Sequence, residues 1–169
     1  HALYHCWALN EVMIPFHCDR RDWTAAREAS AELQGAAEAQ SMAMRTHVAR
    51  AAALAIDLLQ GGDGLETYAR EVALIRAGEF YTLIPWLDGV LAQALARNGR
   101  TSEALARLED AITTSQRSTL GWWLAELMRM RAELLDQSEP ESPAALEAIQ
   151  AAHALGREQG ALTLARRAG

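Results

Sequence analysis

The chain has 169 residues, of which 50% are hydrophobic and 22% are charged, and this is enough for a globular domain with a substantial core. Its formal net charge of −6 argues against nonspecific binding to nucleic acid, because contacts with phosphates require a basic face. Alanine and leucine dominate while β-branched residues are scarce, so the composition predicts an all-α protein.

The predicted helices come in pairs along the chain. Turn residues lead into alanine-rich amphipathic stretches at Asp22, Gly64, Thr101 and Ser142, at intervals of 42, 37 and 41 residues. We call the helices that begin there the B helices. The helices that precede them, the A helices, are expected at residues 2–16, 42–60, 80–97 and 119–137, followed after the last B helix by a partial ninth helix at 161–169. Pro15 is expected to kink or end the first A helix, whereas Pro85 fits the first turn of the third.

The B helices also share a face. Shifts of 79 and 41 residues bring apolar positions of the first, third and fourth B helices into register, whereas the second fits only if its register slips by one residue. The matching sets are Ala25, Ala104 and Ala145; Ala26, Leu105 and Leu146; and Ala29, Leu108 and Ile149. Because one hairpin cannot bury its apolar face alone, the repeat predicts a single domain over 1–169. The predicted fold is a right-handed superhelix of antiparallel helix hairpins with about four repeats.

Three segments between residues 98 and 169 carry a family resemblance: GRTSEALARLEDAI, GWWLAELMRMRAELL and PAALEAIQAAHALGREQGALTLARRA. They resemble the C-terminal tetratricopeptide-like region of large bacterial signalling ATPases. In that family a winged-helix transcription-factor domain or a nucleotide cyclase domain and an NTPase module come before the helical repeats. The resemblance implies a TPR-like α-solenoid that serves bacterial signal transduction or transcription regulation. Because His1 opens directly into a helical pattern, we also expect the chain to be a fragment of a longer protein.

Two adjacent tryptophans open the fourth A helix. Trp123 continues an apolar stripe and is expected in the core, whereas Trp122 heads a polar series and is expected at a surface. The equivalent stripe across the A helices predicts a concave binding groove, because Trp and Arg are the side chains that most often carry binding energy. The candidate groove residues are Trp7, Arg50, Trp86, Trp122, Glu126 and Arg129. In the alternative interpretation the tryptophans fill gaps between helices and the arginines pair with acidic residues at helical spacing.

The sequence offers no catalytic constellation. The His-Cys pairs at 5–6 and 17–18 stand about 18 Å apart along one helix, too far to share a zinc ion. His47 has no nearby nucleophile to activate, and His153 takes a packing position when the repeats are aligned. The GGDG segment at 61–64 lacks the Lys-Ser/Thr of a phosphate loop and predicts an interhelical turn. We therefore expect no catalytic residue, no metal and no cofactor.

These patterns predict a non-enzymatic module for protein–protein interaction. We expect it to bind a protein or peptide, including the NTPase domain of its own parent, without direct contact to nucleic acid. The alternative is a small-molecule effector that occupies the same groove. Two cysteines make no disulfide framework and no apolar run is long enough to span a bilayer, so we expect a cytoplasmic protein. The sequence also allows a homodimer through exposed ends of the chain, where Leu3 and Trp7 lie.

Overall fold

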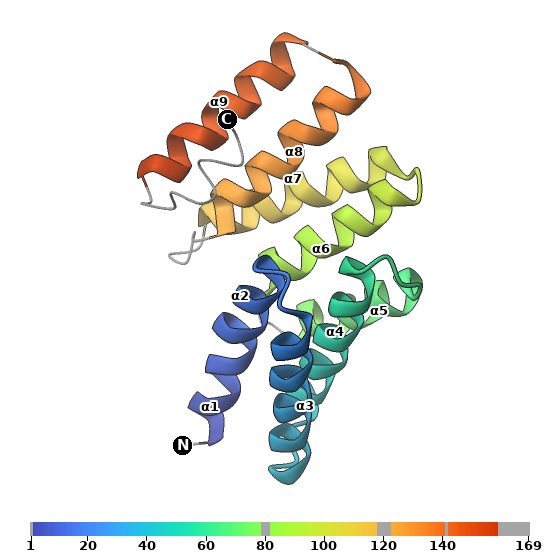
Figure 1. Ribbon diagram of the computed structural model, residues 1–169, viewed down its shortest axis with the longest axis vertical. Coiled ribbons are helices and arrows are strands. Elements are labelled where there is room, and N and C mark those ends of the chain that lie inside the picture. Colours follow the sequence, from blue (N-terminus) through green and yellow to red (C-terminus); the bar gives the residue numbers. More distant parts are fainter. Residues whose placement is uncertain (1, 79–81, 118–122, 141, 159–169) are drawn as a thin grey trace. The chain divides into compact units, whose positions relative to one another are not determined.

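The computed structural model describes residues 2–78, 82–117, 123–140 and 142–158 (Figure 1). Helices and short turns make up these ranges, and no strand occurs in them, which confirms the all-α prediction. None of the described helices is long and apolar enough to cross a membrane. The contacts divide the chain into two compact units, His1–Leu91 and Ala92–Gly169, where the sequence predicts one domain. The predicted ninth helix lies outside the described residues.

The first unit contains four helical segments and the beginning of a fifth. The first segment runs without interruption through α1 (Ala2–Ala8), the π-helix η1 (Leu9–Met13) and α2 (Ile14–Asp19). It is followed by α3 (Trp23–Ala39), α4 (Ala43–Leu59), α5 (Leu65–Ala77) and the first half of α6 (Ile84–Arg97). Helix α3 packs against α1, η1, α2 and α4, and α4 packs in turn against α5. The buried Tyr68 hydroxyl of α5 donates a hydrogen bond of 2.9 Å to the Leu87 carbonyl, which ties α6 to this unit.

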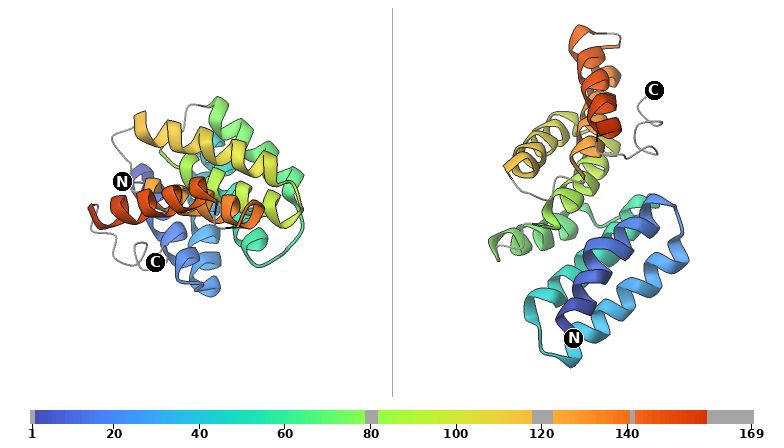
Figure 2. Two further views of the ribbon diagram at one scale, coloured as in Figure 1. Left: turned by 90° about the horizontal axis from the view of Figure 1, so that it is seen from above. Right: turned by 90° about the vertical axis from the view of Figure 1, so that its left-hand side faces the viewer.

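The second unit contains the end of α6 and three further helices. These are α7 (Thr101–Arg117), α8 (Leu124–Ser138) and α9 (Pro143–Glu158). Helix α8 packs against both α7 and α9. Helices α8 and α9 lie next to each other in Figure 1, and they overlap in the two views of Figure 2. Leu108 of α7 and Leu127 of α8 are among the fully buried side chains, so the core of this unit lies between these helices.

The B helices begin where the turn chemistry predicts. Helix α3 starts one residue after Asp22, whose carboxylate accepts a hydrogen bond of 3.2 Å from the Ala25 amide. Helix α9 starts one residue after Ser142, whose hydroxyl accepts a bond of 3.2 Å from the Ala145 amide. Helix α5 follows Gly64, which has a φ of +116° that other residues rarely adopt. The GGDG segment is therefore an interhelical turn, as predicted.

Burial corrects the register of the repeat. Ala26 is fully buried and Ala25 only half-buried, so the face of α3 matches that of α7 with a shift of 78 residues instead of 79. Two neighbouring alanines look alike in sequence, and only the packing tells which one faces the core. All four B helices then share one inward face, with buried or half-buried residues at intervals of four, three and four. The sets are Ala26, Ser30, Leu33 and Ala37; Tyr68, Val72 and Ile75; Ala104, Leu108, Ala111 and Ser115; and Ala145, Ile149, Ala152 and Gly156.

The structure confirms the predicted position of one proline of the A helices and corrects the predicted effect of the other. Pro85 stands in the first turn of α6, as predicted, because the helix begins at Ile84. Of the two predicted effects of Pro15, a kink or an end of the first A helix, the end is wrong, since the helical segment continues to Asp19. The amide of Ile14 donates to the carbonyl of Leu9, five residues back, and this wider π-turn comes immediately before the proline, which has no amide hydrogen to donate.

Candidate functional site

The six predicted groove residues are distributed over both units. Trp7, Arg50 and Trp86 belong to the first unit, Glu126 and Arg129 belong to the second, and Trp122 lies outside the described residues. Trp7 on α1 is 45% exposed and Arg50 on α4 is also exposed. Trp86, by contrast, is only 4% exposed, so it packs inside the protein, as the alternative interpretation of the tryptophans predicts. Neither unit on its own contains the predicted set.

Arg129 is engaged in a network within its own helix. Its guanidinium holds the Glu126 carboxylate with two hydrogen bonds of 2.7 and 2.9 Å, and it also pairs with Glu133. Glu126 is almost completely buried. This is the pairing at helical spacing that the alternative interpretation predicts for Arg129. Asp57, the acidic residue two turns after Arg50 on α4, accepts instead from Arg27 of α3 at 2.9 Å.

Trp123 is buried at the start of α8, which confirms its predicted place in the core. Its neighbour Trp122, predicted at a surface, is among the residues that the structure does not describe. The core stripe that begins with Trp123 continues through Leu127 and Leu134, both of which are buried. The apolar period of α8 was therefore sufficient to place one of the two rings.

A buried polar network crosses the first unit at the π-helix. Thr82 donates its hydroxyl to the Glu11 carboxylate at 2.6 Å, and Asn10 donates its amide to the same oxygen at 3.2 Å. The guanidinium of Arg45 on α4 donates to the side-chain amide oxygen of Asn10 at 2.9 Å. Asn10, Glu11 and Arg45 are all buried. The network joins the first helical segment to α4 and to the residues that precede α6.

Burial sets the ionisation of this network. It raises the pKa of Glu11 above its ordinary value of 4.5, against the opposing effects of the Thr82 hydrogen bond, the Arg45 charge and the Asn10 hydrogen bond. Burial also lowers the pKa of Arg45, whereas the nearby Cys6 and Glu11 raise it. The hydrogen bonds among these side chains hold three segments of the first unit together.

Replacing Glu11 with glutamine should flatten the dependence of the protein's stability on pH. Because the folded state binds a proton at Glu11 more readily than the unfolded chain does, stability rises as the pH falls through the folded-state pKa. Glutamine has no proton to gain and can still accept the bond from Thr82. Urea unfolding of both proteins between pH 4.5 and pH 8 measures the difference, and parallel pH profiles would contradict the buried, proton-binding carboxylate.

The soft metal ligands of the sequence are dispersed. Cys6 and Cys18 are free, buried thiols, and burial together with the charge of Asp19 raises the pKa of Cys18 to about 12. His5 pairs with Glu32 at 2.8 Å, and His47 lies 2.7 Å from Glu71. Among the described residues, no group of three or more His, Cys, Asp or Glu side chains is arranged to hold a metal ion.

The second unit contains a cavity of about 580 Å³ that the sequence did not predict. It opens between α7, α8 and α9, and its walls combine apolar side chains with three charged ones. The lining residues are Glu109, Ile112, Thr113, Met128, Arg131, Ala144, Glu147, Ala148 and Ala151. The Arg131 guanidinium lies 3.4 Å from the Glu109 carboxylate and joins α8 to α7 beside the cavity.

The cavity lies on a different face of α8 from the predicted groove. Met128 and Arg131 line the cavity. Met128 comes two residues after Glu126, and Arg131 comes two residues after Arg129. A separation of two residues turns the side chain by about 200° around a helix. One signal in the sequence could have found it. Ala144, Ala148 and Ala151 recur at helical spacing on α9, where larger side chains would fill the space between the helices.

No protein-family model, no curated protein sequence and no solved structure matches this chain significantly. The resemblance to the helical-repeat region of bacterial signalling ATPases therefore stays a prediction from the residues themselves. The functional conclusion rests on the cavity and the charges around it.

Proposed function

We propose that the chain is a non-enzymatic interaction module whose hairpins stack into a right-handed, TPR-like superhelix and whose second unit binds a segment of a partner protein. The cavity between α7, α8 and α9 carries this proposal. Its lining combines the apolar side chains of Ile112, Met128 and three alanines with three charged side chains, a composition typical of sites that fix an apolar side chain and orient its neighbours.

The charges at the rim favour a basic partner segment. Two acidic residues, Glu109 and Glu147, line the cavity together with one basic residue, Arg131, and Arg131 lies against Glu109. Glu147 forms no ion pair with any residue that the structure describes, and its side chain is exposed on α9. A peptide that places Lys or Arg beside a large apolar residue fits both parts of the cavity, because the cation meets Glu147 while the apolar group covers Met128.

The regulatory role follows from the resemblance to signalling ATPases. In that setting the partner segment belongs to the NTPase module of the same regulator. Binding of this segment in the cavity then couples the conformation of the NTPase module to that of the helical repeats. The proposal that the NTPase module supplies the partner segment needs the whole regulator for its test. The simpler claim that the cavity binds a peptide can be tested on this chain alone.

A library of random peptides displayed on phage tests this proposal. We expect selection on the wild-type chain to enrich sequences with Lys or Arg next to Leu, Met or Phe. Ala148→Leu, which fills the cavity, should weaken the binding of an enriched peptide at least tenfold, or about 1.4 kcal/mol. Ala154→Leu is the matched control, because Ala154 is exposed on the same helix outside the cavity lining. Equal affinity of both variants would reject the cavity as the binding site.

The volume of the cavity favours a second candidate function, the binding of a small effector molecule. Pockets for such ligands usually measure about 300–1,000 Å³, and 580 Å³ lies within this range. A thermal-shift screen with a metabolite library separates the two functions. A ligand at 100 times its Kd should add about 2.7 kcal/mol of stability to the wild type and to Ala154→Leu. A shift that Ala148→Leu retains would place the ligand elsewhere.

A further inference from the structure

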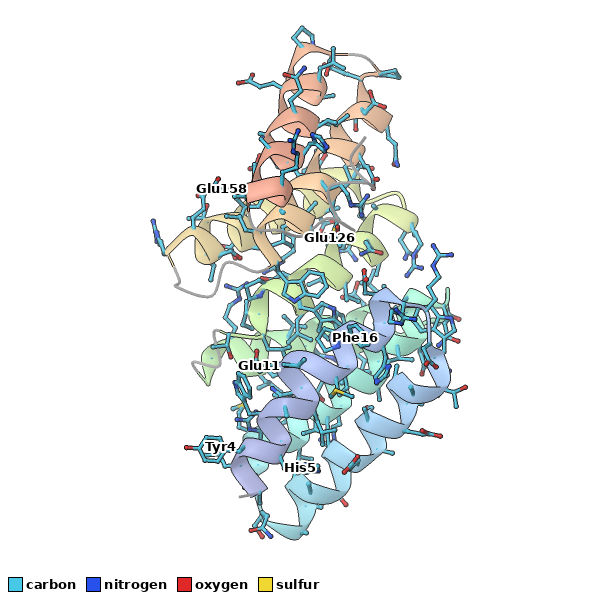
Figure 3. All side chains as sticks on the ribbon, turned by 60° about the vertical axis from the view of Figure 1, so that its left-hand side comes forward. Tyr4, His5, Glu11, Phe16, Glu126 and Glu158 are labelled. Atoms are coloured by element: carbon cyan, nitrogen blue, oxygen red, sulfur yellow. The ribbon has the colours of Figure 1, made fainter. Side chains whose placement is uncertain are left out.

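The cavity of the second unit extends along two turns of α9. Each of its three helices contributes lining residues spaced by three or four positions, so each turns one face toward the cavity. On α9 the lining runs from Ala144 to Ala151, about 10.5 Å at 1.5 Å per residue. Helix α9 then continues to Glu158, which is labelled in Figure 3. All the lining residues are exposed or half-buried, so the cavity is open to solvent.

The three alanines that line the cavity on α9 have charged counterparts on α7. The shift of 41 residues that aligns the two helices places them on Glu103, Arg107 and Asp110. These counterparts are exposed or half-buried, although α8 and α9 follow α7 in the chain. A following hairpin therefore leaves this face of a B helix open. Charged side chains suit a face that meets water, whereas the alanines of α9 suit a face against which another element packs closely.

The volume of the cavity favours a helix over an extended segment as the occupant. A water molecule takes up about 30 Å³ in the liquid, so 580 Å³ gives room for on the order of 20 non-hydrogen atoms, or roughly five side chains of the size of leucine. A helix presents three or four apolar side chains on one face over two turns. An extended segment covers the same length with about three residues, and alternate side chains point away from the cavity.

We propose that the cavity binds an amphipathic helix of the partner, with Leu, Met or Phe at positions i, i+4 and i+7 and with Lys or Arg at i+3. This inference rests on the proposed function and adds the conformation and register of the partner segment. The apolar residues of such a helix share one face, which covers Ile112, Met128 and the alanines. The cation beside them meets Glu147, because Glu109, the other acidic residue of the lining, already contacts Arg131 at 3.4 Å.

Two synthetic peptides of identical composition test the conformation of the occupant. The helix peptide, about 16 residues of mainly alanine and glutamine, carries leucine at i, i+4 and i+7 and arginine at i+3. The strand peptide carries the same residues with the leucines at alternate positions. We expect the helix peptide to bind with a Kd at least tenfold below that of the strand peptide in fluorescence anisotropy. Proline in place of an alanine on its outer face should raise its Kd at least tenfold, because proline breaks the helix.

Substitutions on α9 test where the partner helix lies. Glu147→Arg should raise the Kd of the helix peptide at least tenfold, and glutamate in place of the peptide's arginine should restore the affinity. Leu146→Arg is the matched control, because it also adds an arginine to α9, while Leu146 is 49% exposed and lies outside the lining. Ala144→Leu and Ala151→Leu stand at the two ends of the lining, so each should raise the Kd of a helix that fills both turns.

The outcomes separate the helical occupant from the peptide-binding function itself. If the phage selection yields binders but the helix peptide binds no better than the strand peptide, or its proline variant binds equally well, the helix is rejected while the proposed function stands. An effect at only one of Ala144 and Ala151, or equal losses from Glu147→Arg and Leu146→Arg, also overturns this placement of the helix. If neither peptide binds and the selection enriches nothing, the proposed function fails and the helix fails with it.

Discussion

Replacing Leu108 with alanine should lower the free energy of unfolding by about 2–5 kcal/mol. Leu108 is fully buried on α7, at the centre of the inward face that the B helices share. Its removal leaves a void between packed helices, and alanine recovers little of the loss through its slightly better helix propensity. Urea unfolding followed by circular dichroism measures the change.

Leu105→Ala is the matched control for this prediction. Leu105 stands on the same helix one turn away and is only half-buried, so the same truncation should cost less than half as much. The pair also tests the register of the repeat, because the sequence placed Leu105 and Leu108 on one face. A larger effect at Leu105 than at Leu108 would show that the inward face of α7 has been assigned incorrectly.

Replacing Arg45 with methionine should destabilise the first unit by about 3 kcal/mol. Arg45 donates to Asn10 at 2.9 Å, and its positive charge favours the ionised carboxylate of the buried Glu11. Methionine fills much of the volume but supplies neither the hydrogen bond nor the charge. The carboxylate then remains buried with only its neutral donors, Thr82 and Asn10. Thermal and urea unfolding both report the loss.

A second substitution separates the charge from the packing. In the double variant Arg45→Met with Glu11→Leu, the whole charged pair becomes apolar, which is often close to neutral in buried sites. We expect the double variant to lose less stability than Arg45→Met alone, with a coupling above about 1 kcal/mol. Strictly additive losses would mean that Arg45 and Glu11 act independently and that the network does not operate as a unit.

Local chemistry explains why the helix pairs could be predicted. Asp22, Gly64 and Ser142 each supply what a helix start needs, a capping side chain or a left-handed backbone conformation, within one or two residues of the helix. The burial of Trp123 also followed from the apolar period of α8. Signals of this kind depend on a few neighbouring residues, so they can be recognised in the sequence without knowledge of the tertiary structure.

The features that could not be predicted depend on distances between helices. Ala25 and Ala26 are equivalent in composition, and only the packed neighbour shows that Ala26 faces inward. Glu11 looks like a surface residue until Arg45 and Thr82, 34 and 71 residues later, are seen beside it. The cavity is lined by three helices, so it can be recognised only when the positions of all three are known. The division of the predicted groove residues between two units likewise depends on contacts between helices that the sequence does not specify.

The buried thiols have a practical consequence for spectroscopy. Cys6 is inaccessible, and the raised pKa of Cys18, about 12, keeps its sulfur protonated at neutral pH. A cysteine introduced at an exposed position such as Ala154 would therefore react with a maleimide dye in the folded protein while both natural thiols stay unlabelled. Fluorescence from a single dye on α9 could then follow events at the neighbouring cavity in an otherwise natural chain.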